Sequence, residues 1–177
     1  VITFDRHPAE VLHGRDVPLV LPLEERLRLI GECGVGFVQV LPFTKEFAQT
    51  TAEQFVREFV VGRLGASAIL LGHDSHFGKN RQGDFDLLAR IGEEIGIRVE
   101  TCEPELHRGQ PMSSSLIRQA VAEGRLEEAA EILGRPYAVW GTVRSGDRRG
   151  AGLGFPTANL DVARMARPPR GVYAVET

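Results

Sequence analysis

The chain has 177 residues, of which 42% are hydrophobic and 25% charged, a composition typical of a soluble globular protein with room for one domain and part of a second. The formal net charge of −3 predicts no general attraction to nucleic acid or to an anionic membrane, so an anionic ligand needs a local site. The apolar runs are too short to span a bilayer, and two cysteines without metal-like spacing indicate a reducing, cytoplasmic setting.

Strand and helix signals alternate from the first residue to about residue 134. Thr51 and Gln54 have the spacing of a capping box, and Asp84 and Ser113 stand where helices begin. Because parallel strands need crossover connections, the alternation predicts an α/β fold with a parallel sheet wrapped by helices. The expected strands, with those at 1–4 and 68–71 buried, cover 1–4, 37–41, 68–71 and 97–101; the expected helices cover 23–33, 51–65, 84–91, 113–121 and 126–133.

After residue 134 the sequence pattern becomes typical of β-structure, with strand-like runs at 137–144 and in the final segment GVYAVET. We therefore predict a domain boundary near Arg135, giving domains 1–134 and 135–177. The chain also opens directly on the strand-like VITF, so we expect both ends to be cut from a longer protein.

The stretch SSSLIR, residues 113–118, stands at a predicted helix start. Unpaired N–H groups there carry partial positive charge, Ser114 and Ser115 add hydroxyl donors, and Arg118 supplies a planar fork for phosphate oxygens. An N-cap serine followed by a surface arginine is the alternative reading, and the spacing alone does not decide between them.

Two loops follow predicted strands, where open parallel sheets bind ligands. In TFDRHP, Asp5 and His7 are either an acid–base pair or parts of a strand-end turn. In GHDSHFG, the two histidines His73 and His76 and the carboxylate of Asp74 resemble a metal cluster, but no further strong ligand lies nearby and a polar loop is favoured.

The glycine-rich stretch GDRRGAGLGFPTANL, residues 146–160, has two readings. Gly150, Gly152 and Gly154 alternate, which permits close backbone approach to an anion, and Thr157 and Asn159 offer oxygen ligands to a hard cation such as Mg²⁺. A hairpin loop rich in turn formers explains the same composition.

Taken in order, these segments resemble the bifunctional bacterial FAD synthetase family, in which riboflavin kinase is joined to FMN adenylyltransferase. The resemblance extends over nearly the whole chain. Its segments are VITFDRHP, LPFTKEFA, LGHDSHFGKNRQGD, SSSLIR, LGFPTANL and GVYAV.

The resemblance implies a Rossmann-like nucleotidyltransferase that joins FMN to the AMP part of ATP, followed by the start of a small β-barrel kinase that phosphorylates riboflavin. ATP, riboflavin, FMN and FAD are then substrates or products, with Mg²⁺ as cofactor. It implies adenylyltransferase ATP contacts at Ser113, Ser114, Ser115 and the catalytic Arg118; a flavin–nucleotide cleft at Phe4, Asp5, His7, Pro8, Asp74, Phe77 and Gly78; and kinase ATP contacts at Gly150, Gly152, Gly154, Pro156, Thr157 and Asn159, the last two on the metal.

Three positions depart from the family pattern: Arg6 replaces proline, Ser115 replaces threonine, and Ser75 replaces phenylalanine, which removes an aromatic wall. The family's HxGH histidines would lie before Val1 and the kinase's general base after Thr177, so we expect this chain to make little FAD and no FMN. The alternatives are another nucleotidyltransferase, such as a cytidylyltransferase, and a non-catalytic flavin- or nucleotide-binding module. We expect small-molecule partners, without nucleic acid or membrane, and leave the oligomeric state open.

Overall fold

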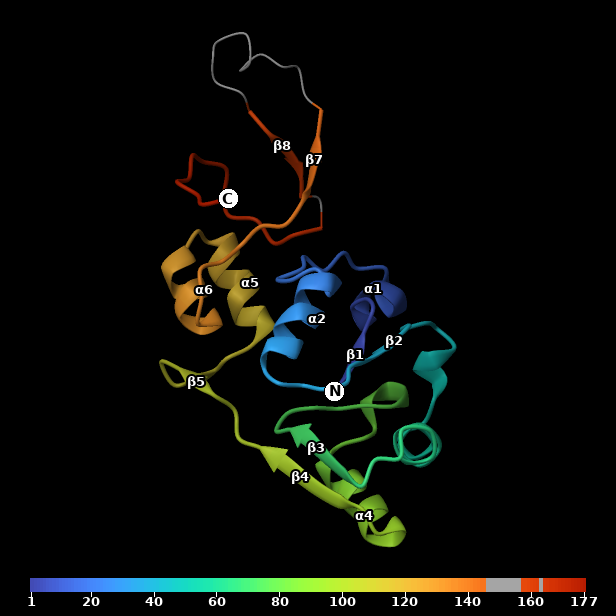
Figure 1. Cartoon of the computed structure of the whole chain (residues 1–177). Coiled ribbons are helices and arrows are strands. Elements are labelled where there is room, and N and C mark those ends of the chain that lie inside the picture. The colour runs from blue at the N-terminus through green and yellow to red at the C-terminus, as the bar shows by residue number, and fades with distance from the viewer. Residues whose placement is uncertain (146–156, 163) are drawn as a thin grey trace. The chain divides into compact units, whose positions relative to one another are not determined.

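The computed structural model describes residues 1–145, 157–162 and 164–177 (Figure 1). Helices and short strands alternate, so the predicted mixed α/β character is confirmed. The strands are β1 (Ile2–Phe4), β2 (Gln39–Leu41), β3 (Ala68–Gly72), β4 (Arg98–Cys102), β5 (Leu106–His107), β6 (Gln110–Pro111), β7 (Thr142–Arg144) and β8 (Asn159–Asp161). The α-helices are α1 (Pro8–His13), α2 (Leu23–Glu32), α3 (Ala52–Gln54), α4 (Phe85–Ile95), α5 (Ser114–Ala122) and α6 (Leu126–Leu133). The 3₁₀ turns are Phe47–Gln49 and Lys79–Arg81, and a π-helix covers Phe55–Val61.

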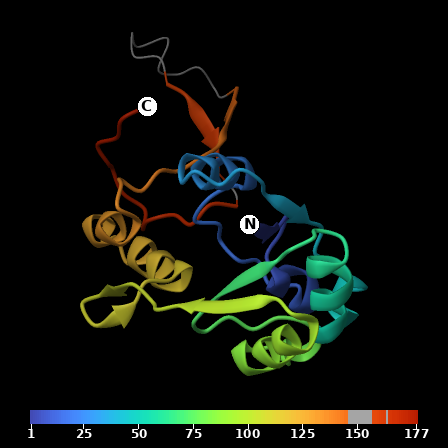
Figure 2. The same cartoon turned by 60° about the horizontal axis from the view of Figure 1, so that its bottom comes forward.

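The first four strands, β1 to β4, form two parallel pairs, and parallel pairing is what the alternation predicts. β1 lies beside β2 with Phe4 opposite Leu41, and β3 lies beside β4 with Gly72 opposite Cys102. Within the described residues these strands make two separate two-stranded sheets, whereas the sequence predicts one. Both views show α4 along the β3–β4 pair (Figure 2).

The strands predicted to be buried are only half covered. Leu88 and Ile91 of α4 pack against the side of β3 that carries Ile69. Successive side chains point to opposite faces of a strand, so the next residue, Leu70, faces away and is 65% exposed. The expectation of fully buried strands is therefore wrong for β3, since only one of its faces is packed.

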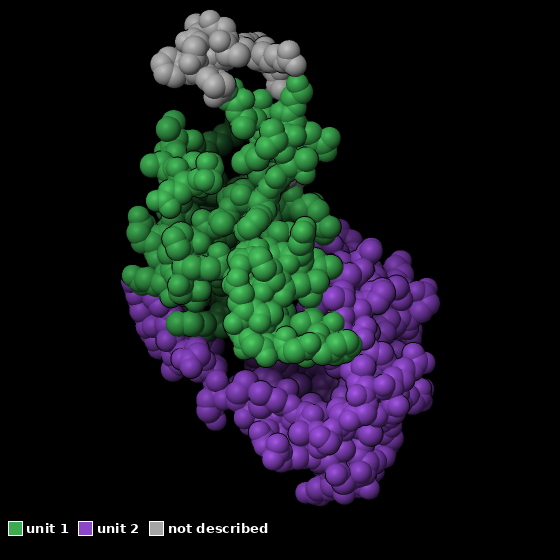
Figure 3. All heavy atoms as spheres, in the orientation of Figure 1, with its two compact units in different colours: residues 1, 16–38, 112–177 green, residues 2–15, 39–111 purple. Residues whose placement is uncertain are grey.

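The described chain divides into two compact units, each with its own hydrophobic core (Figure 3). Unit 1 comprises residues 1, 16–38 and 112–177, and unit 2 comprises 2–15 and 39–111. The core of unit 1 is centred on α5 and α6, and that of unit 2 on Val56, Leu88 and Ile91. The domain boundary near Arg135 remains a prediction.

The helix starts follow the local sequence signals. The Thr51 hydroxyl accepts from the Gln54 N–H while the Gln54 side chain returns to the Thr51 N–H, so the predicted capping box is confirmed. Asp84 caps α4 through the Leu87 N–H at 2.9 Å, and Ser113 caps α5 through the Leu116 N–H at 3.2 Å. None of the helices in the described segments is both long and apolar enough to cross a membrane.

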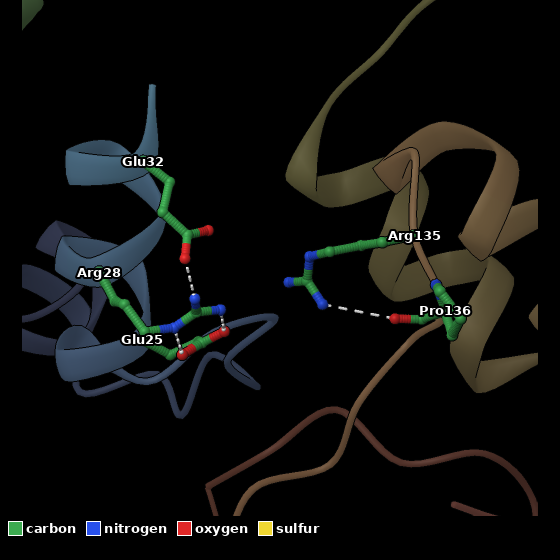
Figure 4. A network of polar contacts seen from close by, with 5 residues as sticks. All are labelled: Glu25, Arg28, Glu32, Arg135 and Pro136. Carbon is green, nitrogen blue, oxygen red and sulfur yellow. Dashed lines mark hydrogen bonds and ion pairs between the residues drawn. The ribbon is translucent and has the colours of Figure 1, made fainter. Parts of the chain in front are cut away.

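Unit 1 contains a buried carboxylate, that of Glu25 on α2 (Figure 4). The Arg28 guanidinium donates two hydrogen bonds to this carboxylate, of 2.8 and 2.7 Å, and also forms an ion pair with Glu32. The Arg28 fork, assisted by the charge of Arg135 in the segment after α6, holds the pKa of Glu25 below its usual range. The ion pair therefore satisfies a charge that burial alone would destabilise.

The C-terminal segment carries less regular structure than its composition predicts. The run expected over 137–144 is a strand only at β7, which pairs antiparallel with β8. The strand expected over 171–177 is wrong, because these residues lack a ladder partner within the described chain and Val172 and Val175 are exposed.

Candidate functional site

Unit 2 contains a cavity of about 720 Å³. It opens where β1 ends at Phe4 and beside the loop that follows β3, the edge at which parallel sheets bind ligands. The lining residues are Phe4, His7, Pro8, Ala9, Leu12, His13, Phe43, Phe47, Ala48, Gln49, Thr50, Phe55, His76, Phe77, Gly78, Asn80 and Arg81.

Phenylalanine rings dominate the wall of the cavity. Phe4, Phe43 and Phe47 meet edge to face, with centroids 5.0 to 5.8 Å apart, and Phe47 meets Phe55 at 6.0 Å. Phe55 then stacks on Phe59 at 5.6 Å and contacts Phe77 at 6.2 Å. A continuous aromatic surface of this kind suits a flat aromatic ligand, which can stack on ring faces and meet ring edges.

Asp5 connects the ends of β1 and β2. Its backbone N–H donates to the Leu41 carbonyl at 3.1 Å, and its carboxylate accepts from the Phe43 N–H at 2.9 Å. The Phe43 N–H, with help from Arg6, lowers the pKa of Asp5. Asp5 thus orients the loop that carries Phe43, and it is not itself among the residues that line the cavity.

His7 and Pro8 line the cavity at the start of α1. A backbone N–H can only donate, so the 3.1 Å contact from the Ala9 N–H makes His7 Nδ1 an acceptor and leaves the proton of a neutral ring on Nε2. Pro8 follows at the first helical position, where its missing N–H has no cost. Asp5 and His7 thus both serve the strand-end turn that was one of the two readings of this loop.

The loop from Phe77 to Gly83, which we call the arginine loop, forms another wall. Phe77 and Gly83 exchange two backbone hydrogen bonds of 2.9 Å, and the Lys79 N–H donates to the Thr50 carbonyl at 2.8 Å. A Cβ at Gly78 would stand 2.5 Å from the Ala52 nitrogen, so only glycine fits there. The arginine loop is thereby closed on itself and tied to the chain before α3.

The remaining residues of the predicted cleft lie beside this cavity, not on its wall. Asp74 and Ser75 are not lining residues. Serine at position 75 therefore takes no aromatic ring from the wall of this cavity, which five phenylalanines line. The Asp74 carbonyl lies 3.0 Å from His76 Nδ1. Within the described residues, no three histidine, cysteine or carboxylate side chains gather as metal ligands.

The predicted phosphate-binding helix start belongs to unit 1. Ser113 is the N-cap, and Ser114 and Ser115 are exposed in the first turn of α5. Arg118 donates through Nε to the Pro18 carbonyl at 2.6 Å, and burial lowers the pKa of its guanidinium. One nitrogen of the predicted phosphate fork is therefore bonded to the backbone at Pro18.

The predicted kinase site is only partly described. Gly150, Gly152, Gly154 and Pro156 lie outside the described residues. Thr157 is exposed, and Asn159 opens β8 opposite Arg144. Two neutral oxygen donors do not make a Mg²⁺ site, since the ion is usually held through carboxylates and substrate phosphates, and the nearby Asp161 pairs with Arg144.

Sequence reasoning missed Phe43, Phe47, Phe55 and Arg81 as site residues. Six of the nine phenylalanines in the chain belong to this one cluster, but the sequence alone does not show that their rings meet. Helical and strand periodicity assigns such residues to a core, and only their contacts show that they border a cavity.

Comparison with known proteins shows the family of the chain. Residues 1–116 match the family model of FAD synthetase, and residues 133–177 match that of riboflavin kinase. The chain belongs to the FAD synthetase family. The resemblance seen in the sequence segments is thereby confirmed.

Relatives in the FAD synthetase family are named bifunctional riboflavin kinase/FMN adenylyltransferase. The Escherichia coli K12 protein is 38% identical over 99% of this chain and 56% of its own length. The Haemophilus influenzae protein is 33% identical over 99% of this chain and 58% of its own length. The chain therefore spans little more than half the length of these relatives.

One solved structure with the same fold bears a different name. A crystal structure described as a macrolide-efflux protein from Streptococcus pneumoniae superposes with a TM-score of 0.83 at 31% identity. The match covers 97% of this chain and 56% of the other. The FAD synthetase family match rests on the two family models and on the named relatives.

Proposed function

We propose that this chain is part of a flavin-cofactor enzyme, with an FMN adenylyltransferase domain up to about residue 134 and a riboflavin kinase domain from about Arg135. The observation that carries the proposal is the aromatic cavity of unit 2, which lies inside the region matched by the FAD synthetase model. The two family models support the boundary, because the FAD synthetase match ends at residue 116 and the riboflavin kinase match begins at residue 133.

The cavity has the size and chemistry for a flavin ring. Its volume of about 720 Å³ falls within the range of roughly 300–1,000 Å³ of small-molecule sites. The isoalloxazine is flat and aromatic, so it gains stacking and edge contacts with Phe4, Phe43 and Phe47, beyond the burial of its apolar area. Flavin binding in this cavity is the basis of the proposed adenylyl transfer.

The proposed reaction is attack of the FMN phosphate on the α-phosphate of ATP, with pyrophosphate as leaving group. The oxygen–phosphorus bond to pyrophosphate breaks as the FMN oxygen bonds to phosphorus, and the chain forms no covalent intermediate. Catalysis then depends on positioning and on donors that stabilise phosphoryl oxygens. The α5 start offers such donors in the backbone N–H groups, the Ser114 and Ser115 hydroxyls and the Arg118 guanidinium.

For the kinase domain we propose that residues 150–159 hold ATP, with Thr157 and Asn159 near Mg²⁺. Mg²⁺ bound there would neutralise phosphate charge. The described residues supply too few oxygen ligands to assemble that site by themselves, and we derive no step through the metal.

We also propose that the two parallel strand pairs belong to one doubly wound, Rossmann-like sheet and that β7 and β8 begin a small barrel. Parallel pairing in both sheets and the position of the cavity at their carboxyl ends support the first statement. Antiparallel pairing of β7 and β8 within the riboflavin kinase match supports the second.

A flavin titration tests the proposed function. FMN fluorescence should be quenched as the purified chain is added, and Phe47→Ala should weaken binding about tenfold or more, since one lost stacking partner is worth roughly 1–3 kcal/mol. Phe37→Ala is the matched control, because that ring is 64% exposed and outside the aromatic cluster. Unquenched FMN, or equal effects of the two substitutions, would contradict the proposal.

Pyrophosphate release from FMN and ATP tests the catalytic half. Quenching with release supports an adenylyltransferase, whereas quenching without release leaves a flavin-binding module, the second candidate. A cytoplasmic location also remains a proposal, supported by two exposed free thiols, Cys33 and Cys102.

A further inference from the structure

We infer that Arg81 makes the aromatic cavity select a flavin that carries a phosphate ester over riboflavin. The inference rests on the proposed function of the cavity, to which it adds the residue that determines specificity. An aromatic wall binds the ring common to both flavins, so discrimination has to come from a group that recognises the phosphate.

The charges around the cavity favour an anion. Among the described residues, those that line it include one arginine, Arg81, and three histidines, His7, His13 and His76, but no aspartate or glutamate. Of these, only the guanidinium offers the planar fork of N–H donors that matches phosphate oxygens in a bidentate pair. Within the described part of the chain, no carboxylate forms an ion pair with Arg81.

Arg81 and His76 converge at one place. Arg81 Nη2 lies 3.5 Å from His76 Nδ1. His76 Nδ1 also lies 3.0 Å from the Asp74 carbonyl oxygen. Nδ1 holds either a proton or a lone pair, so it cannot serve both neighbours at once. The shorter contact indicates that Nδ1 carries a proton and donates it in a hydrogen bond to the Asp74 carbonyl. Nδ1 then cannot accept from Arg81, so the guanidinium remains able to bind a phosphate.

The backbone holds Arg81 in a strained conformation. Asn80 and Arg81 have φ of 55° and 58°, the left-handed region, which costs a non-glycine residue on the order of 1–2 kcal/mol. The paired hydrogen bonds of Phe77 with Gly83 and the bond from the Lys79 N–H to the Thr50 carbonyl keep the arginine loop closed around them. Strain that the surroundings enforce is typical of ligand-binding segments, where it positions a side chain before the ligand arrives.

Titration with two flavins tests the inference on the 177-residue chain. We expect FMN to bind at least tenfold more tightly than riboflavin, with only FMN binding weakened by added salt. Arg81→Ala should weaken FMN binding tenfold or more and riboflavin binding by a much smaller factor. Arg81→Lys should keep part of the preference, since charge remains but the bidentate fork is lost.

Arg63→Ala is the matched control, since this arginine of unit 2 is exposed and does not line the cavity. Equal weakening of both flavins by Arg81→Ala would show that Arg81 shapes the cavity and would overturn the inference. Equal binding of both flavins to the unaltered chain would overturn it too, while the proposed flavin site stands. Binding of neither flavin would overturn both.

Discussion

Asp5 shows how a single side chain prepares the site without lining it. Its carboxylate accepts the Phe43 N–H and pairs with Arg6 at 3.2 Å, so the loop after β2 is held against the end of β1. The charged form makes both interactions, which is why its pKa is lowered. The position of Phe43 in the cavity therefore depends on the ionisation of a neighbouring group.

We predict that the stabilising effect of Asp5 disappears in acid. A pKa lowered by folding contributes stability above the unfolded value, about 3.9, and loses it as the pH falls through the folded value. Asp5→Asn should lower the free energy of unfolding by roughly 1 kcal/mol at pH 7, and this difference should shrink below about pH 4. Urea unfolding at several pH values measures it, and a difference that stays constant into acid would contradict the prediction.

Gly78 is a second residue on which the cavity depends. Its φ is +71°, and a Cβ would collide with the Ala52 backbone. Gly78→Ala should destabilise unit 2 by roughly 3 kcal/mol or more, because overpacking adds to the left-handed cost. Gly65→Ala is the control: φ is +65° there but nothing lies within 4 Å, so about 1–2 kcal/mol is expected. Chemical denaturation compares the two, and similar losses would refute the role of the Ala52 contact.

At the scale of elements, α4 is built by local signals and covers one face of β3 and β4. Asp84 caps its first turn, Gly96 ends it in a left-handed conformation, and Leu88 and Ile91 fall on one face. The helix therefore begins, ends and packs where its own residues dictate. The strands beside it have no such local control over what covers their other face.

We predict that removing the cap of α4 weakens unit 2. Asp84→Ala should lower the free energy of unfolding by about 1 kcal/mol, since the Leu87 N–H loses its acceptor. Asp84→Ser should keep nearly all of the stability, because serine caps equally well. Thermal unfolding followed by circular dichroism provides the measurement, and equal losses in both variants would point to charge rather than capping.

For the whole molecule, two separate cores predict two responses to mutation and ligand. Ile91 belongs to the core of unit 2 and Ile132 to that of unit 1, so Ile91→Ala and Ile132→Ala should each cost roughly 2–5 kcal/mol in different thermal transitions. FMN at 100 times its dissociation constant should add about 2.7 kcal/mol only to the transition shifted by Ile91→Ala. Calorimetry with and without FMN tests this, and a single transition shifted by both variants would contradict it.

Residues near one another in the sequence determined much of this protein by themselves. The helix starts at Thr51, Asp84 and Ser113 follow from side chains that bond to N–H groups three residues on, and the strand–helix alternation predicts parallel pairing. The family, too, was evident from the order of its segments.

Tertiary structure alone decided which residues form the cavity and which strand faces stay open. Phe4, Phe43, Phe55 and Phe77 come from four separate segments, and each ring is placed by strand pairing and loop closure far along the chain. Leu70 is exposed for the same reason, since coverage of a strand depends on elements that its own sequence does not specify. Capping and periodicity act within a few residues, whereas a cavity wall exists only once distant segments have packed.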